Sequence, residues 1–165
     1  MKTKILIINA DYYLNISSGL QAAAEFTLRT ESKIKVKYKT IKVPGILEIP
    51  FVISKNMKKF DAFIALGCVI KGETPHFDLI SRTTFNSIMK LSVDNKKPIG
   101  NGIITALNIS QANHRSRVEK LDKNILKRSV KGKLIKPNKG REATKAVLSL
   151  LRIVKNGKKW SYPKS

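Results

Sequence analysis

Residues 71–76, with the sequence KGETPH, bring together groups that bind a phosphate and groups that move a proton. They follow an apolar run at 62–66, typical of a buried strand, and we expect residues 67–70 to begin a loop and a helix to start near His76. Backbone N–H groups converge where a buried parallel strand leads through a glycine loop to a helix, and such a site suits an anion. A histidine at its mouth could transfer protons at neutral pH. The stretch therefore predicts an anion site beside an acid/base group.

Strand-like and helix-like patterns alternate along the chain, which predicts a parallel sheet covered by helices on both faces. The predicted fold is α/β and flavodoxin-like, a three-layer α/β/α sandwich with a four-stranded parallel sheet. The carboxyl ends of such strands meet at one edge, where ligands bind. The expected strands are 4–9, 33–43, 61–66 and 99–105, and the expected helices are 16–30, 47–57, 76–93, 109–116 and 139–155.

Local patterns add detail to three of these elements. Lysines alternate with apolar residues across 33–43, which is typical of a strand near a sheet edge with one wet face. Gly100 and Gly102 lie inside the fourth expected strand and allow another group to approach its backbone closely. On the final helix, the apolar residues expected to share one face are Ala143, Ala146, Val147, Leu150, Leu151 and Val154.

Composition limits the class of protein. At 165 residues the chain is long enough for one domain with a substantial core. The single cysteine, Cys68, excludes an internal disulfide, and the separation of His76 from His114 in the chain argues against a metal cluster. The apolar run near the N-terminus is too short for a signal peptide or a membrane span, so we expect a cytoplasmic protein without membrane contact.

The net charge of +22, from 33 Lys/Arg against 11 Asp/Glu, raises the question of a nucleic-acid or other polyanion partner. Lysines are spread over nearly every segment, which favours a lysine-rich surface without that function. The stretch from 115 to 141 is the densest, with eleven basic residues. A nucleic-acid partner is therefore disfavoured, although this stretch keeps the alternative open.

Four segments resemble the 6,7-dimethyl-8-ribityllumazine synthase family: VPGILEIP at 43–50, FDAFIALGCVIKGETPHFD at 60–78, PIGNGIIT at 98–105 and NKGREA at 138–143. They occur in the family's order, and the first two are separated by the family's spacing. The resemblance implies condensation of 5-amino-6-(D-ribitylamino)uracil with 3,4-dihydroxy-2-butanone 4-phosphate, the penultimate step of riboflavin biosynthesis. It implies no cofactor and no metal, and active sites shared between adjacent subunits of a homo-oligomer.

The resemblance assigns roles to particular residues. His76 stands where the family has the histidine that assists proton transfer, and Glu48 where a carboxylate holds ribityl hydroxyls. From the residues alone, Glu48 could simply cap a helix. Tyr12 falls at the aromatic position that stacks on the pyrimidine, with Tyr13 as the alternative. The other substrate contacts implied by the resemblance are Ile46, Leu47, Cys68, Val69, Ile70 and Asn101.

A second group of residues would bind the phosphate of the butanone. Glu73 and Thr74 match the family's phosphate loop. Arg115 matches the arginine that clamps this phosphate from a neighbouring subunit, a role suited to a planar guanidinium. Lys139 and Glu142 match a second basic group and its nearby acid. Each of these charges could instead be a solvated surface residue.

Residues 117–137 depart from the family, in which a much shorter connection joins the arginine to the NKG motif. We expect one domain over 1–155 that carries this basic insert, and a basic tail at 156–165. The insert could displace Arg115. Because this connection lies near the surfaces that pack pentamers into icosahedral shells in the family, the insert predicts a pentamer rather than a sixty-subunit particle.

Two functions are consistent with these patterns. One is the enzyme itself, and the other is a catalytically weak protein of the same fold that binds a flavin precursor or a polyanion. The combination of an acid/base candidate, His76, with two phosphate cations, Arg115 and Lys139, favours the enzyme.

Overall fold

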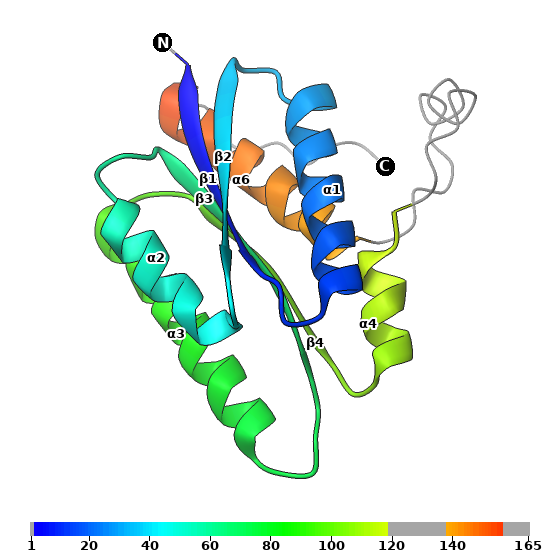
Figure 1. The fold of residues 1–165 in the computed structure, drawn as a ribbon. Coiled ribbons are helices and arrows are strands. Elements are labelled where there is room, and N and C mark those ends of the chain that lie inside the picture. The colour runs from blue at the N-terminus through cyan, green and yellow to red at the C-terminus, as the bar shows by residue number, and fades with distance from the viewer. Residues whose placement is uncertain (1, 119–137, 157–165) are drawn as a thin grey trace, which may run out of the picture.

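A four-stranded parallel sheet forms the centre of the protein in the computed structural model, which describes residues 2–118 and 138–156 (Figure 1). The strand order is β2-β1-β3-β4, and the strands run over Val36–Val43, Thr3–Ala10, Ala62–Ile70 and Ile99–Ala106 respectively. Every pairing is parallel, so all the carboxyl ends reach the same edge. The sheet predicted from the alternating pattern is confirmed, with β2 at an edge.

Helices cover both faces of this sheet, which confirms the three-layer arrangement (Figure 1). Helices α1, α4 and α6 lie on one face, and α2 and α3 lie on the other. A single 3-10 turn, Ile46–Glu48, precedes α2. The helices run over Leu14–Thr30 (α1), Ile49–Asn56 (α2), His76–Asn95 (α3), Ile109–Ser116 (α4) and Lys139–Asn156 (α6).

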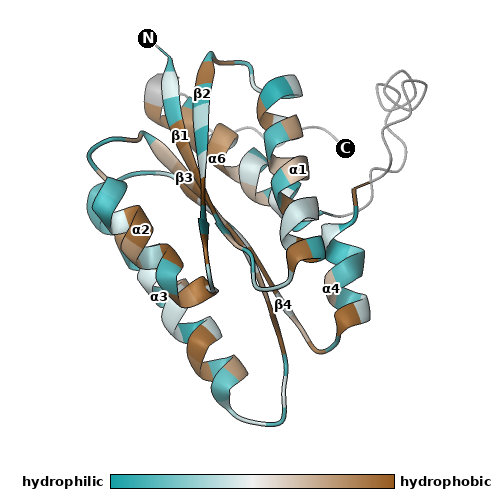
Figure 2. Ribbon diagram, in the orientation of Figure 1, coloured by the Kyte–Doolittle hydropathy of each residue, from teal (hydrophilic) through white to brown (hydrophobic). Residues whose placement is uncertain are grey.

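The two central strands are apolar on both faces because each face is covered by helices. In β1, Ile5 and Ile7 point into the cluster with α1 and α6, whereas Leu6 and Ile8 point into the cluster with α2 and α3. All four side chains are fully buried. Figure 2 shows the resulting pattern, with hydrophobic strands at the centre and hydrophilic residues concentrated on the outer sides of the helices.

The expected end of the third strand at Leu66 is wrong, because β3 continues through Gly67 and Cys68 to Ile70. Glycine usually weakens a strand, but here it is required by packing. A Cβ at Gly67 would lie only 2.8 Å from Cγ2 of Ile46. The strand therefore extends beneath the turn that precedes α2, and the loop begins at Lys71.

The glycines of β4 serve the close approach that the sequence predicted, and the approaching group is helix α6. A Cβ at Gly100 would collide with the backbone carbonyl of Ala143. One at Gly102 would lie 2.6 Å from Cδ2 of Leu66 on β3 and 3.2 Å from the Cβ of Ala143. Helix α6 thus packs almost backbone to backbone on the sheet. Figure 1 shows α6 crossing behind the strands on the same side as α1.

The predicted apolar face of α6 is partly wrong. Ala143, Val147 and Leu151 are buried as expected, but Leu150 and Val154 are 42% and 65% exposed. The buried stripe continues instead through Thr144 and Leu148, because the helix is rotated toward β4 and α1 by its contact with the β4 glycines. Ala146 is also exposed.

None of the helices in the described ranges is both long enough and apolar enough to cross a membrane.

Candidate active site

A pocket of about 400 Å³ opens at the carboxyl edge of the sheet, between the ends of β1, β2 and β3 and the first turn of α3. Eight of the site residues implied by the resemblance line it, and so does Tyr13, the alternative to Tyr12. The structure thus brings together lining residues from three segments that are far apart in the sequence: 12–13, 44–48 and 68–80. The lining residues are Tyr12, Tyr13, Pro44, Gly45, Ile46, Leu47, Glu48, Cys68, Val69, Ile70, His76 and Ile80.

Two tyrosines form one wall of this pocket and differ in how far they are buried. Tyr12 is 76% exposed, whereas Tyr13 packs against the core that contains α1. Their rings meet edge to face with centroids 4.9 Å apart. Burial, together with the neighbouring Tyr12 and Cys68, raises the pKa of Tyr13. Tyr13 therefore supports the wall, and Tyr12 presents a free aromatic face to a ligand.

Another part of the lining is the 3-10 turn that carries Glu48. Its carboxylate oxygen Oε2 accepts a hydrogen bond from the backbone N–H of Gly45 at 2.9 Å. The capping alternative is therefore observed, but it uses one acceptor of a group that has about four lone-pair sites. The second oxygen, Oε1, remains available for the hydroxyls of a ligand, since Glu48 is exposed.

The inner wall of the pocket is the end of β3. Cys68 and Val69 are each only 8% exposed, and removal from water raises the pKa of the Cys68 thiol to about 12. At neutral pH the thiol is therefore protonated and is a poor nucleophile. Cys68 contributes shape and apolar surface, which suits the flat face of a heterocycle.

The predicted anion loop, residues 71–75, connects two lining residues of the pocket but does not line it itself. Its start is fixed by the backbone N–H of Lys71, which donates to the carbonyl of Ala106 at 2.9 Å. Glu73, Thr74 and His76 are all exposed, and His76 is the first residue of α3. No side chain from the described part of the chain caps this helix, so its first N–H groups can meet an anion.

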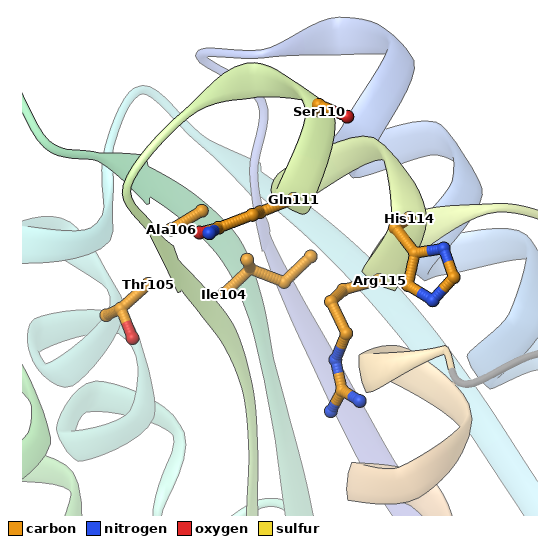
Figure 3. Close-up of a pocket in the computed structure, with 7 residues that line it drawn as sticks. All are labelled: Ile104, Thr105, Ala106, Ser110, Gln111, His114 and Arg115. Atoms are coloured by element: carbon orange, nitrogen blue, oxygen red, sulfur yellow. The ribbon is translucent and has the colours of Figure 1, made fainter.

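Arg115 lies in a second pocket, of about 540 Å³, between the end of β4 and helix α4 (Figure 3). Figure 3 shows its guanidinium extending away from α4 toward the start of α6. There Nη2 of Arg115 is 2.9 Å from Oε2 of Glu142, and Nζ of Lys139 is 3.7 Å from the same oxygen. The three predicted charges therefore form one cluster, and the insert has not separated Arg115 from α6.

In the described part of the chain, His76 lines the first pocket and Arg115 lines the second. Arg115 and the neighbouring Lys139 thus lie on a different part of the surface from His76, the acid/base candidate. Asn101 lines neither pocket. It is half-buried in β4, and its Oδ1 accepts a hydrogen bond from the backbone N–H of Ile103 at 3.0 Å.

Sequence analysis missed some of the lining residues. Ile80 lies one helical turn after His76, and helical spacing could have placed both on the same side of α3. Gln111 lies one helical turn before Arg115 on α4 and could have been found in the same way, whereas His114 directly precedes Arg115 and helical spacing gives no such signal. Among the described residues, no three His, Cys, Asp or Glu side chains are grouped so that they could hold a metal ion.

The fold and this edge define an α/β protein with ligand pockets at the carboxyl ends of parallel strands and a helix N-terminus suited to an anion. Comparison with known families is more specific. The family model of 6,7-dimethyl-8-ribityllumazine synthase matches residues 2–155. The chain belongs to this family, as the motifs predicted.

Curated relatives that carry the same enzyme name are similar to this chain over most of its length. The 6,7-dimethyl-8-ribityllumazine synthase of Nitrobacter hamburgensis is 36% identical over 157 residues, which cover 91% of this chain and 85% of that protein. The enzyme of Bartonella tribocorum is 40% identical over 126 residues, 74% of this chain and 80% of its own length. The enzyme of Agrobacterium fabrum is 35% identical, covering 93% of this chain and 96% of the relative.

Proposed function

We propose that this protein condenses 5-amino-6-(D-ribitylamino)uracil with 3,4-dihydroxy-2-butanone 4-phosphate to give 6,7-dimethyl-8-ribityllumazine. This reaction is the penultimate step of riboflavin biosynthesis. The observation that carries the proposal is the pocket at the carboxyl edge, where eight residues matched to the family site converge in a family member. Family membership does not favour the alternative of a weak flavin-precursor or polyanion binder.

The geometry supports separate binding sites for the two parts of the ribitylamino substrate, its pyrimidine ring and its ribityl chain. The exposed ring of Tyr12 is placed to stack on the pyrimidine, and the end of β3, with Cys68 to Ile70, supplies a dry wall beside it. Ile46, Leu47 and Glu48 on the 3-10 turn face the ribityl chain, with a carboxylate oxygen of Glu48 as a hydroxyl acceptor. Binding by a stacked ring and a few directed polar groups fixes orientation at a small entropic cost.

His76 would act on the bond-forming and bond-breaking steps. The amine of the pyrimidine attacks the carbonyl of the butanone with loss of water, the phosphate leaves, and ring closure releases further water. Each step moves a proton, and an imidazole at the pocket mouth can accept and return it. Thr74 and Glu73 lie in the adjoining loop, where backbone N–H groups at the start of α3 can hold the departing phosphate.

We further propose that each active site is completed by a second copy of the chain. Arg115 lines a pocket separate from that of His76 and shares Glu142 with Lys139. The two cations would clamp the phosphate over the neighbour's His76. Exposed apolar side chains on α2 and α3, which include Phe51 at 72% and Met89 at 65%, support packing between copies. We favour a cytoplasmic pentamer over a sixty-subunit particle, and sedimentation at the larger mass would refute this.

The direct test is product formation from the two purified substrates, followed by the absorbance of the lumazine. Arg115→Ala should raise KM for the butanone phosphate by roughly 10- to 150-fold, because a charge-assisted hydrogen bond contributes about 1.5–3 kcal/mol. Arg117→Ala is the matched control, since this exposed arginine lies two residues away and lines neither pocket. Absence of turnover in the wild type would refute the proposed reaction. An unaltered KM in Arg115→Ala would show that another residue binds the phosphate.

A further inference from the structure

We propose that Asn138 is a positioning residue for the phosphate-binding cations, because its side-chain amide locks the end of α4 to the start of α6. Arg115 lies on the last turn of α4, and Lys139 and Glu142 lie on the first turn of α6. The inference rests on the proposed function only in naming the anion as the phosphate of the butanone. The lock itself follows from contacts within the chain.

The amide of Asn138 is buried, with 4% of the residue exposed, and it bonds in two directions. Its Nδ2 donates to the carbonyls of Ser116 at 3.0 Å and Arg117 at 3.1 Å, and more weakly to that of Gly19 at 3.4 Å. The carbonyls at the end of α4 have no partner within their own helix. Asn138 therefore closes the C-terminal end of α4.

The other half of the same amide begins α6. Oδ1 of Asn138 accepts hydrogen bonds from the backbone N–H groups of Gly140 at 2.9 Å and Arg141 at 3.3 Å. This is the N-cap arrangement, in which a side-chain oxygen satisfies free N–H groups of the first turn. One planar side chain thus joins two helix ends, and an asparagine is suited to this because it carries both donors and an acceptor.

The helix backbones that surround Asn138 are in close contact with one another. A Cβ at Gly19 would collide with the carbonyl of Ser116, and a Cβ at Gly140 would collide with the carbonyl of Leu20. Helices α1, α4 and α6 therefore meet at backbone contact around Asn138. The relative position of α4 and α6 is set here rather than by flexible side chains.

This link matters for the anion site because the covalent connection between the two helices is long. Residues 118–137 separate Arg117 from Asn138, and a connection of that length constrains the distance between its ends only weakly. Arg115 directly precedes Ser116, whose carbonyl accepts a hydrogen bond from Asn138, and Lys139 directly follows Asn138. The 2.9 Å contact between Arg115 and Glu142 depends on this register.

Two uncharged substitutions of Asn138 distinguish its link between α4 and α6 from ordinary capping of α6 alone. Asn138→Ser keeps an acceptor for the N-terminus of α6 but cannot reach the carbonyls of α4, whereas Asn138→Ala loses both. Thr27→Ala serves as a control for stability. Thr27 is fully buried, and its hydroxyl donates to the carbonyl of Ala23 at 2.7 Å, but it lies far from α4 along α1.

The measurement is binding of inorganic phosphate by calorimetry at low ionic strength, together with KM for each substrate. We expect both Asn138 variants to weaken phosphate binding and raise KM for the butanone phosphate by about 10- to 100-fold, as expected for displaced positioning groups. KM for the ribitylamino substrate should change less than about twofold, because its pocket lies elsewhere, and Thr27→Ala should alter neither affinity.

The outcomes separate the two proposals. Phosphate binding at wild-type strength in Asn138→Ser would overturn the lock, even if Asn138→Ala fails to fold. Equal increases in KM for both substrates would also overturn it, because they indicate a general loss of structure. Phosphate binding that depends on Asn138 in a protein without turnover would uphold the lock and refute the enzyme.

Discussion

Replacing residues 119–137 with a four-residue Gly/Ser linker tests whether the anchored ends, rather than the insert, hold α4 and α6 together. Asn138 donates hydrogen bonds to the carbonyls of Ser116 and Arg117, so the two ends of the connection already lie side by side. A short linker can therefore close the gap without moving either helix. We expect the variant to fold and to retain its affinity for the butanone phosphate.

The expected change in stability follows from loop length. Twenty residues, 118–137, lie between Arg117 and Asn138, and the variant leaves five. Each halving of a flexible loop lowers the entropic cost of closing it by about 0.6 kcal/mol, so two halvings stabilise the folded state by about 1.2 kcal/mol. In a domain of this size the corresponding rise in Tm is roughly 2–5 °C.

Thermal unfolding at a fixed subunit concentration is the appropriate assay, because association of copies shifts the apparent stability. A second variant, with a Gly/Ser linker as long as the original segment, is the control: it removes the residues of the insert without shortening the loop. This control should melt close to the wild type. If both variants lose stability, or if both raise KM for the butanone phosphate, the insert itself contributes to the junction and the reasoning is wrong.

Three further predictions concern the scaffold around the site. Gly100→Ala should lower the free energy of unfolding by about 1–3 kcal/mol in urea titrations, because the added methyl group would overpack the contact with α6. Gly72→Ala is the control: the space around Gly72 is open, so this variant should have the stability of the wild type. Burial by itself would raise the pKa of Glu31, but hydrogen bonds and ion pairs with Lys145 and Arg141 on α6 together lower it, so Glu31→Gln should be less stable than the wild type near pH 7. That difference should shrink as pH falls below 4.5 and vanish below the lowered pKa, whereas a constant difference in pH-dependent unfolding would contradict the assignment. Cys68, with its pKa raised to about 12, should react slowly with iodoacetamide at pH 8 and rapidly in urea, and mass spectrometry showing equal rates would refute its burial.

The order and type of the main elements could be predicted because periodicity reports burial directly. The end of β3 could not, because Gly67 was interpreted from local propensity as a break. Its tolerance in the strand comes from Ile46, a residue in another segment that occupies the space a side chain would need. The face of α6 was misassigned for a similar reason: the contact of Gly100 with Ala143 sets the rotation of the helix, and apolar spacing alone does not.

The sequence was sufficient to predict that the site residues follow the strand ends, but not which of them line the same pocket. Parallel topology brings the residues after each strand to one edge, which correctly grouped Tyr12, Glu48 and His76. The same rule does not show that Arg115 lies in a different pocket from His76. Nor could residue types distinguish Tyr12 from Tyr13, since the difference is one of burial.

The position of α6 along the chain has a consequence for synthesis on the ribosome. One apolar face of the central strands, with Ile5, Ile7 and Ile64, is covered by α6 as well as by α1, yet α6 emerges only after the insert. Translation proceeds at about 5–20 residues per second, so residues 118–137 delay this cover by roughly 1–4 s. During that interval the nascent chain exposes hydrophobic surface that chaperones recognise. The insert therefore lengthens the period in which the nascent chain is most prone to aggregate.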